Sequence, residues 1–289
     1  MEAALQLRLL VEKEERISEA EIDRMLADSL LVSKLTQEYE PKYLFNIFKL
    51  VALSEIPFIE RLPYTQKVIQ FINKNCATEA GFSYTGKIAD IVPCYNAMLL
   101  EAYVRLGMAE TKEAQAALNW IKNYQLFARN LKTSWTEKGI CKHGGCLNKT
   151  PCYIGIGKTV RALITYGEYT NHSDPEVENF IEKGLGYMLE HQMFLRLSEE
   201  TPISKYITDN AFPQSYALTA TDLVYIVGKG KKTTNNQVEK LMTLINKKQI
   251  AENQWKIEYI YKYKGYLSFE NRRGKSEWLS HLYPIWLKK

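Results

Sequence analysis

Two kinds of apolar pattern alternate along this chain, and both have the spacing of helices. In the first kind, apolar residues recur every three or four positions and the opposite face is polar, as in residues 65–76. In the second kind, small and apolar residues surround most of the helix, as in PCYNAMLLEAYVRLG from Pro93. A helix with one apolar face lies at a surface, whereas a helix that is apolar all round is buried. The alternation predicts outer, amphipathic helices paired with inner, apolar ones.

The pair of helices recurs. Amphipathic helices are predicted at 65–76, 112–125, 175–192 and 237–249, and apolar helices are predicted to start at Pro93, Pro151, Pro213 and Ser276. The first two of these prolines are 58 positions apart and the next two are 62 positions apart. Proline suits the first turn of a helix, because the missing N–H would have had no partner there. Glycines 107, 167 and 228 stand where the first three apolar helices are expected to end.

Repeated helical hairpins of this kind predict an all-α fold, with the apolar helices as an inner barrel. We expect an α/α toroid of about five hairpins. An open solenoid of the same hairpins is the alternative. Residues 1–56 are expected to form an N-terminal helical cap, and residues 57–289 the toroid, packed together as one domain.

Composition and charge indicate a globular protein and argue against a nucleic-acid-binding or membrane-spanning one. Apolar residues make up 46% of the 289 residues and aromatic residues 12%, which is enough for a large core. The net charge of +5 is spread along the chain, so no nucleic-acid partner is expected. No run approaches the roughly 18 to 20 apolar residues of a membrane span. Charged residues interrupt the N-terminal segment, which argues against a signal peptide and predicts a cytoplasmic location with reduced thiols.

Four of the five cysteines are expected to meet at one mouth of the ring. Cys94 and Cys152 each follow the first proline of an apolar helix, and Cys141 and Cys146 lie in the loop before the second of these helices. Four thiolates suit tetrahedral zinc, and His143 lies among them as a further ligand. There are two alternatives. The cysteines could hold an iron–sulfur cluster, or they could bind no metal and be small buried side chains.

Asp222 is the polar group that we expect at the centre of the barrel. It lies within the apolar segment YALTATDLVYI, with Tyr216 predicted on the same helix. A buried carboxylate needs a cation or a raised pKa. Asp222 is therefore either an acid that meets substrate, together with Tyr216, or the partner of Lys158 or Arg161 in a buried ion pair.

The segment LINKKQIAENQW, residues 244–255, resembles the glutamine–tryptophan motif of squalene and hopene cyclases. Asn253 stands where that motif has glycine, and Tyr124, Gln125 and Trp135 form a looser copy. Residues from about 60 to 289 are thus similar to the prenyltransferase and squalene-cyclase repeat superfamily. PCYIGIGKTVRAL and KSEWLSHLYPIWLKK are similar to segments of an uncharacterised prokaryotic family within it, some of whose members carry a nitrogen-fixation label.

The resemblance implies an enzyme that acts on a hydrophobic or isoprenoid-like ligand in a central cavity. Tyr95, Tyr153, Tyr216 and Trp278 are expected to line that cavity. The chain has neither the DxDD motif of protonating cyclases nor a DDxxD motif for magnesium diphosphate, so catalysis is left undecided. The alternatives are a non-catalytic binding or scaffold protein with a structural zinc, and a zinc-dependent enzyme that activates a thiol. The substrate, the metal and the oligomeric state are left open.

Overall fold

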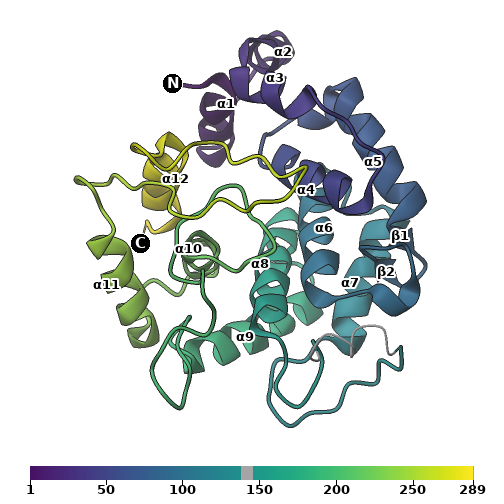
Figure 1. The fold of residues 1–289 in the computed structure, drawn as a ribbon, viewed down its shortest axis with the longest axis vertical. Coiled ribbons are helices and arrows are strands. Elements are labelled where there is room, and N and C mark those ends of the chain that lie inside the picture. The colour runs from purple at the N-terminus through teal and green to yellow at the C-terminus, as the bar shows by residue number, and fades with distance from the viewer. Residues whose placement is uncertain (138–145, 289) are drawn as a thin grey trace.

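The computed structural model describes residues 1–137 and 146–288, and helices make up most of its regular structure (Figure 1). The α-helices are α1 (Ala3–Glu12), α2 (Glu19–Asp28), α3 (Leu30–Thr36), α4 (Tyr43–Leu53), α5 (Pro63–Asn75), α6 (Pro93–Arg105), α7 (Lys112–Tyr124), α8 (Tyr153–Tyr169), α9 (Pro175–Glu190), α10 (Ala220–Lys229), α11 (Glu239–Lys247) and α12 (Glu277–Trp286). Two short antiparallel strands, β1 (Ala77–Thr78) and β2 (Gly81–Phe82), form a hairpin after α5. The prediction of an all-α protein is confirmed.

The two predicted kinds of helix are both present. In α6 every residue except the last is buried, and in α8 burial extends over most of the helix. By contrast, α11 buries only Leu241 and Ile245, and α5 buries one face. The sequence pattern therefore separated the inner from the outer helices correctly, because burial follows the width of the apolar face.

The prediction for the start of α10 was wrong. The helix begins at Ala220 and not at Pro213, because Thr219 and Asp222 form a capping box. The backbone N–H and the hydroxyl of Thr219 both donate to Asp222 Oδ2, at 2.8 and 3.0 Å. These bonds satisfy polar groups that a helix end otherwise leaves unpaired, so they determine the first turn. Tyr216 consequently lies in the segment before the helix, not on it.

The inner helices follow one another in space in their order along the chain. Helix α6 packs against α4 and α8, α8 packs against α10, α10 packs against α12, and α12 contacts α1. Helices α5, α7 and α9 pack on the outside of α4, α6 and α8 (Figure 1). Gly184 permits the close approach of α9 to α8, since a Cβ atom there would lie 2.3 Å from Cγ2 of Val160.

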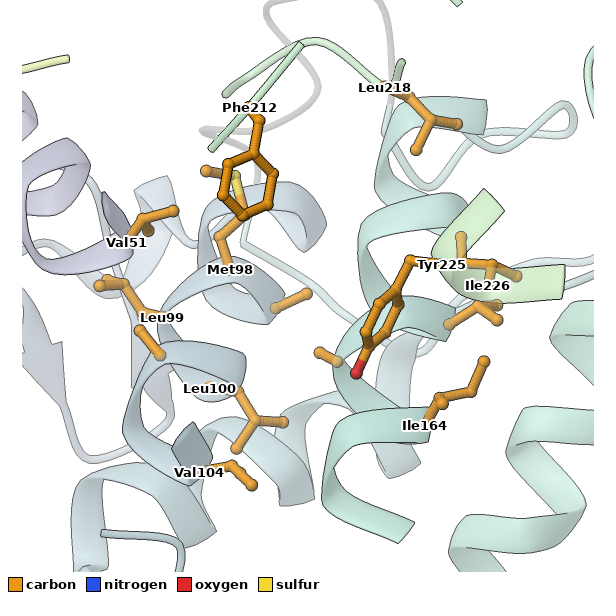
Figure 2. Packing of buried hydrophobic residues seen from close by; sticks show 14 of the residues in the cluster. Val51, Met98, Leu99, Leu100, Val104, Ile164, Phe212, Leu218, Tyr225 and Ile226 are labelled. Atoms are coloured by element: carbon orange, nitrogen blue, oxygen red, sulfur yellow. The ribbon is translucent and has the colours of Figure 1, made fainter. Parts of the chain in front are cut away.

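Apolar side chains fill the space between the inner helices. Figure 2 shows Leu100 and Val104 of α6 with Ile164 of α8 and Tyr225 of α10 in this core. All four side chains are at most 4% exposed. Each fully buried aliphatic or aromatic side chain contributes about 1.5–3 kcal/mol of transfer free energy. This core is the main reason that the inner helices hold their places.

Trp255, the tryptophan of the glutamine–tryptophan segment, ties α11 to α12. Its indole N–H donates to the carbonyl of Ile245, and its own carbonyl accepts from the N–H of Ser276. The indole ring also lies 5.0 Å from the ring of Tyr283. Asn253 has a left-handed φ of 54°, a conformation that glycine and asparagine adopt more readily than other residues.

No helix within residues 1–137 and 146–288 combines the length and the apolar character that crossing a membrane requires.

Candidate functional site

Two of the predicted metal ligands, Cys94 and Cys152, lie at the starts of neighbouring inner helices. Cys94 is in the first turn of α6, and Cys152 is the residue that caps the N-terminus of α8. The two helix starts touch, since a Cβ atom on Gly155 would lie 2.9 Å from Cβ of Pro93. The expected meeting of these two segments is therefore observed.

Cys146 reaches the same place from the preceding loop. The N–H of Cys152 donates to the carbonyl of Cys146 at 3.0 Å, and the side chain of Cys146 is hydrogen-bonded to that of Cys152. Cys94, Cys146 and Cys152 thus lie in adjoining segments at the starts of α6 and α8. The other two predicted ligands, Cys141 and His143, lie outside the described residues. Within the described part of the chain, no group of three or more His, Cys, Asp or Glu side chains has the arrangement of a metal site.

The three thiols differ in acidity. The hydrogen bond from Cys146 lowers the pKa of Cys152 to about 6 against the effect of burial, with help from the N–H groups of Gly155 and Ile154. Burial raises the pKa of Cys94 to about 12, and the neighbouring Cys152 adds to that shift. The pKa of Cys146 is also raised, first by its bond to Cys152. Cys152 is therefore the thiolate of the group at neutral pH.

We expect metal-free protein to be alkylated first at Cys152. The rate with iodoacetamide should rise with pH and reach half its maximum near pH 6, because the thiolate is the nucleophile and its fraction grows as pH passes the pKa. Mass spectrometry of tryptic peptides after short labelling measures this rate. The Cys152→Ser variant should lack the fast phase. A midpoint near the ordinary thiol pKa of about 8.5 would contradict the assignment.

Tyrosine rings surround the cysteine group. The ring of Tyr95 lies 5.5 Å from that of Tyr84 and 5.8 Å from that of Tyr216. Burial raises the pKa of Tyr216, and the neighbouring Cys94 and Cys152 add to the shift. Tyr216 is 38% exposed, so the segment before α10 is open to solvent at this residue.

Asp222 lies deeper and is fully buried in a network of charges. Its Oδ1 accepts from Lys158 Nζ and from Arg161 Nη1, both at 2.9 Å. Its Oδ2 accepts the two bonds from Thr219 that cap α10. The ion-pair alternative is thus the one observed, and both cations are those that the sequence indicated. With four hydrogen bonds, the carboxylate has no free lone pair for a substrate.

Arg161 is the centre of this network. Its Nε lies 3.0 Å from both carboxylate oxygens of Glu101, and its Nη2 donates to Glu55 at 2.8 Å. Gln214 bridges the network, because it donates to Glu101 at 2.9 Å and accepts from Lys158 at 3.3 Å. The guanidinium also lies over the ring of Tyr225, at 4.6 Å from its centroid.

The charges within this network stabilise one another's ionised forms. Burial alone would raise the pKa of Glu101, but the attraction of Arg161 and Arg105 holds it at about 2. Burial lowers the pKa of Lys158, and the nearby carboxylate of Asp222 opposes that shift. No sequence pattern pointed to Glu55 or Gln214 as partners, because each lies outside the inner helices and more than 100 positions from a residue that it binds.

Tyr153 and Trp278, two of the aromatic residues expected around a central cavity, pack against other parts of the chain. Tyr153 points outward from α8, where its hydroxyl donates to the carbonyl of Met193 at 2.7 Å. Trp278 is buried against Phe212, with ring centroids 5.2 Å apart. The direction of a side chain on a helix that is buried all round has no signature in the sequence, and this is why both expectations failed.

No protein-family model matches the chain. No curated protein is significantly similar to it.

Proposed function

We propose that this chain is an α/α toroid of the prenyltransferase and squalene-cyclase repeat type that binds one zinc ion at its cysteine mouth and acts as a rigid, non-catalytic binding protein. The observation that carries this proposal is the hydrogen bonding of Asp222. A cyclase of this type needs an acid that faces its ligand, and all four acceptor positions of this carboxylate are taken by Lys158, Arg161 and Thr219.

Support for the ring comes from the order of helix contacts. The inner helices α4, α6, α8, α10 and α12 contact one another in sequence, and α12 contacts α1, which also contacts α3. Helix α3 in turn contacts α4. An open solenoid would leave its first and last helices apart, so this order favours closure.

Support for zinc comes from the chemistry of the donors. Cys94, Cys146 and Cys152 bring three sulfur atoms from two helix starts and a loop, and Cys152 is already a thiolate at neutral pH. Zinc and iron–sulfur clusters both prefer thiolate ligands, and a closed set of four holds zinc for structure and not for catalysis. The fourth donor would be Cys141 or His143. A bound zinc would supply a fixed junction between α6 and α8.

Elemental analysis tests this proposal directly. Protein purified without chelators and without a metal-affinity step should contain about one zinc per chain. It should lack the visible absorbance and the acid-labile sulfide that an iron–sulfur cluster would contribute. The variant Cys94→Ala should contain less than a tenth of that zinc, whereas Cys76→Ala, at the C-terminal end of α5 and outside the proposed ligand set, should keep it. Metal-free wild-type protein would refute the zinc part of the proposal.

A second function, zinc-dependent activation of a thiol substrate, is favoured by the surroundings of Cys152. The low pKa of Cys152 and the exposed Tyr216 beside it give a thiolate next to an aromatic surface. An open zinc site with three protein ligands leaves one position for a substrate thiol. Extended X-ray absorption would separate the two functions. Four protein ligands support the structural site, and three ligands with one water support the enzyme.

A further inference from the structure

A pocket of about 510 Å³ lies outside the inner helices, between the loop that precedes α8 and the end of α9. Its lining residues are Arg129, Thr150, Pro151, Tyr153, Tyr187, His191, Arg196, Leu197, Ser198 and Ile203. None of the cysteines that the structure describes is among them. The volume is within the range of about 300–1,000 Å³ that is usual for small-molecule sites. The pocket is therefore a second site, and its lining residues Pro151 and Tyr153 flank Cys152 in the chain.

The inner part of this pocket is aromatic. Tyr153 and Tyr187 are buried, and their ring centroids lie 5.2 and 4.9 Å from that of His191. The hydroxyl of Tyr153 is bound to the Met193 carbonyl, so this ring is fixed in place. A flat aromatic group packs well against such a wall, because rings at these distances attract one another beyond the simple burial of area.

His191 forms part of this wall as a neutral ring. Its Nδ1 is hydrogen-bonded to the carbonyl of Leu195 at 2.9 Å, and only 3% of the residue is exposed. Burial lowers the pKa of His191, and the positive charge of Arg129 lowers it further. Its Nε2 has no hydrogen-bond partner among the described residues. The wall therefore carries no cation at neutral pH, and the charges of the pocket are at its rim.

The rim is positively charged. Arg129 and Arg196 are both exposed, and none of the described residues that line the pocket is Asp or Glu. Of the two acids that follow Arg196, Glu200 pairs with Lys240 at 2.9 Å, and Glu199 accepts from the hydroxyl of Thr201 at 3.3 Å. Guanidinium groups bind carboxylates through paired hydrogen bonds of fixed geometry. Two arginines above an aromatic wall match a ligand with a carboxylate at one end and a ring at the other.

The geometry points to a binding site for a small aromatic carboxylate, with its ring against Tyr153 and Tyr187 and its carboxylate between Arg129 and Arg196. The neutral wall and the charged rim determine this orientation. An aliphatic acid would lack the ring contacts, and a neutral aromatic compound would lack the contacts with the arginines. The site requires no metal and no movement of the inner helices.

Calorimetric titration with indole-3-acetate tests this inference, and indole-3-acetamide serves as a neutral ligand of nearly the same shape. The acid should bind with a dissociation constant below about 1 mM and at least about tenfold more tightly than the amide. Arg129→Gln and Arg196→Gln should each weaken binding of the acid by about tenfold, because each removes a charge-assisted hydrogen bond. Both residues are exposed, so neither change should alter the melting temperature.

Arg272→Gln is the matched control, since this arginine is equally exposed but does not line the pocket. It should bind indole-3-acetate as the wild type does. Any of three results would overturn the inference. The acid could fail to show saturable binding up to about 10 mM, the acid and the amide could bind equally tightly, or the Arg129→Gln/Arg196→Gln double variant could still bind the acid as the wild type does.

Discussion

Replacing Arg161 with methionine should destabilise the protein by about 3–5 kcal/mol, which is among the largest effects expected for a single change in this chain. The guanidinium lies 2.8–3.0 Å from oxygen atoms of Glu55, Glu101 and Asp222, and all four side chains are at most 1% exposed. Methionine fills similar space but leaves these carboxylates without their shared cation. Urea unfolding followed by circular dichroism measures the loss.

A matched surface arginine separates the effect of burial from that of charge. Arg61 also contacts two acids, Glu19 and Asp23, but both of these side chains are mostly exposed. Arg61→Met should therefore leave the unfolding curve almost unchanged, since water and salt screen exposed pairs. Adding Glu55→Gln to Arg161→Met should recover part of the lost stability, because without Arg161 the buried Glu55 carboxylate keeps only the longer 3.4 Å pair with Arg8. An Arg161→Met protein as stable as the wild type would show that the network does not hold the inner helices together.

Removing zinc should lower the melting temperature by roughly 10 °C. A ligand present at about 1,000 times its dissociation constant stabilises the folded state by about 4 kcal/mol, and each kcal/mol is worth about 2–4 °C in a chain of this size. The reason is local, since a zinc held by Cys94, Cys146 and Cys152 would clamp the loop before α8 to the starts of α6 and α8. Differential scanning calorimetry with and without a strong chelator measures the shift.

Cysteine variants decide whether this shift belongs to the proposed site. Cys146→Ala should melt at the temperature of the chelated wild type, and chelator should then have no further effect on it. Cys76→Ala should keep the full response to chelator, because Cys76 is buried at the end of α5 and is not one of the proposed ligands. A chelator effect that persists in Cys146→Ala would show that the metal is bound elsewhere.

Much of the secondary structure could be predicted from the sequence because its signals are local. The proline at the start of α6, the serine that caps α12 and the width of each apolar face are all contained within a few turns of one helix. The neighbouring starts of α6 and α8, which carry Cys94 and Cys152, also followed from the repeat. The start of α10 was mispredicted because the capping box of Thr219 and Asp222 is a stronger signal than an upstream proline.

The sequence by itself determined which helices are buried all round and which bury only one face, because these properties depend on residue spacing. Only the tertiary structure decided the partners of Asp222 and Arg161 and the composition of the outer pocket. Arg161 binds Glu55 across 106 positions, and Gln214 binds Glu101 across 113. Contacts between such distant residues have no periodic signature. Such contacts depend on the direction in which each side chain points from a fully buried helix, and tertiary packing determines that direction.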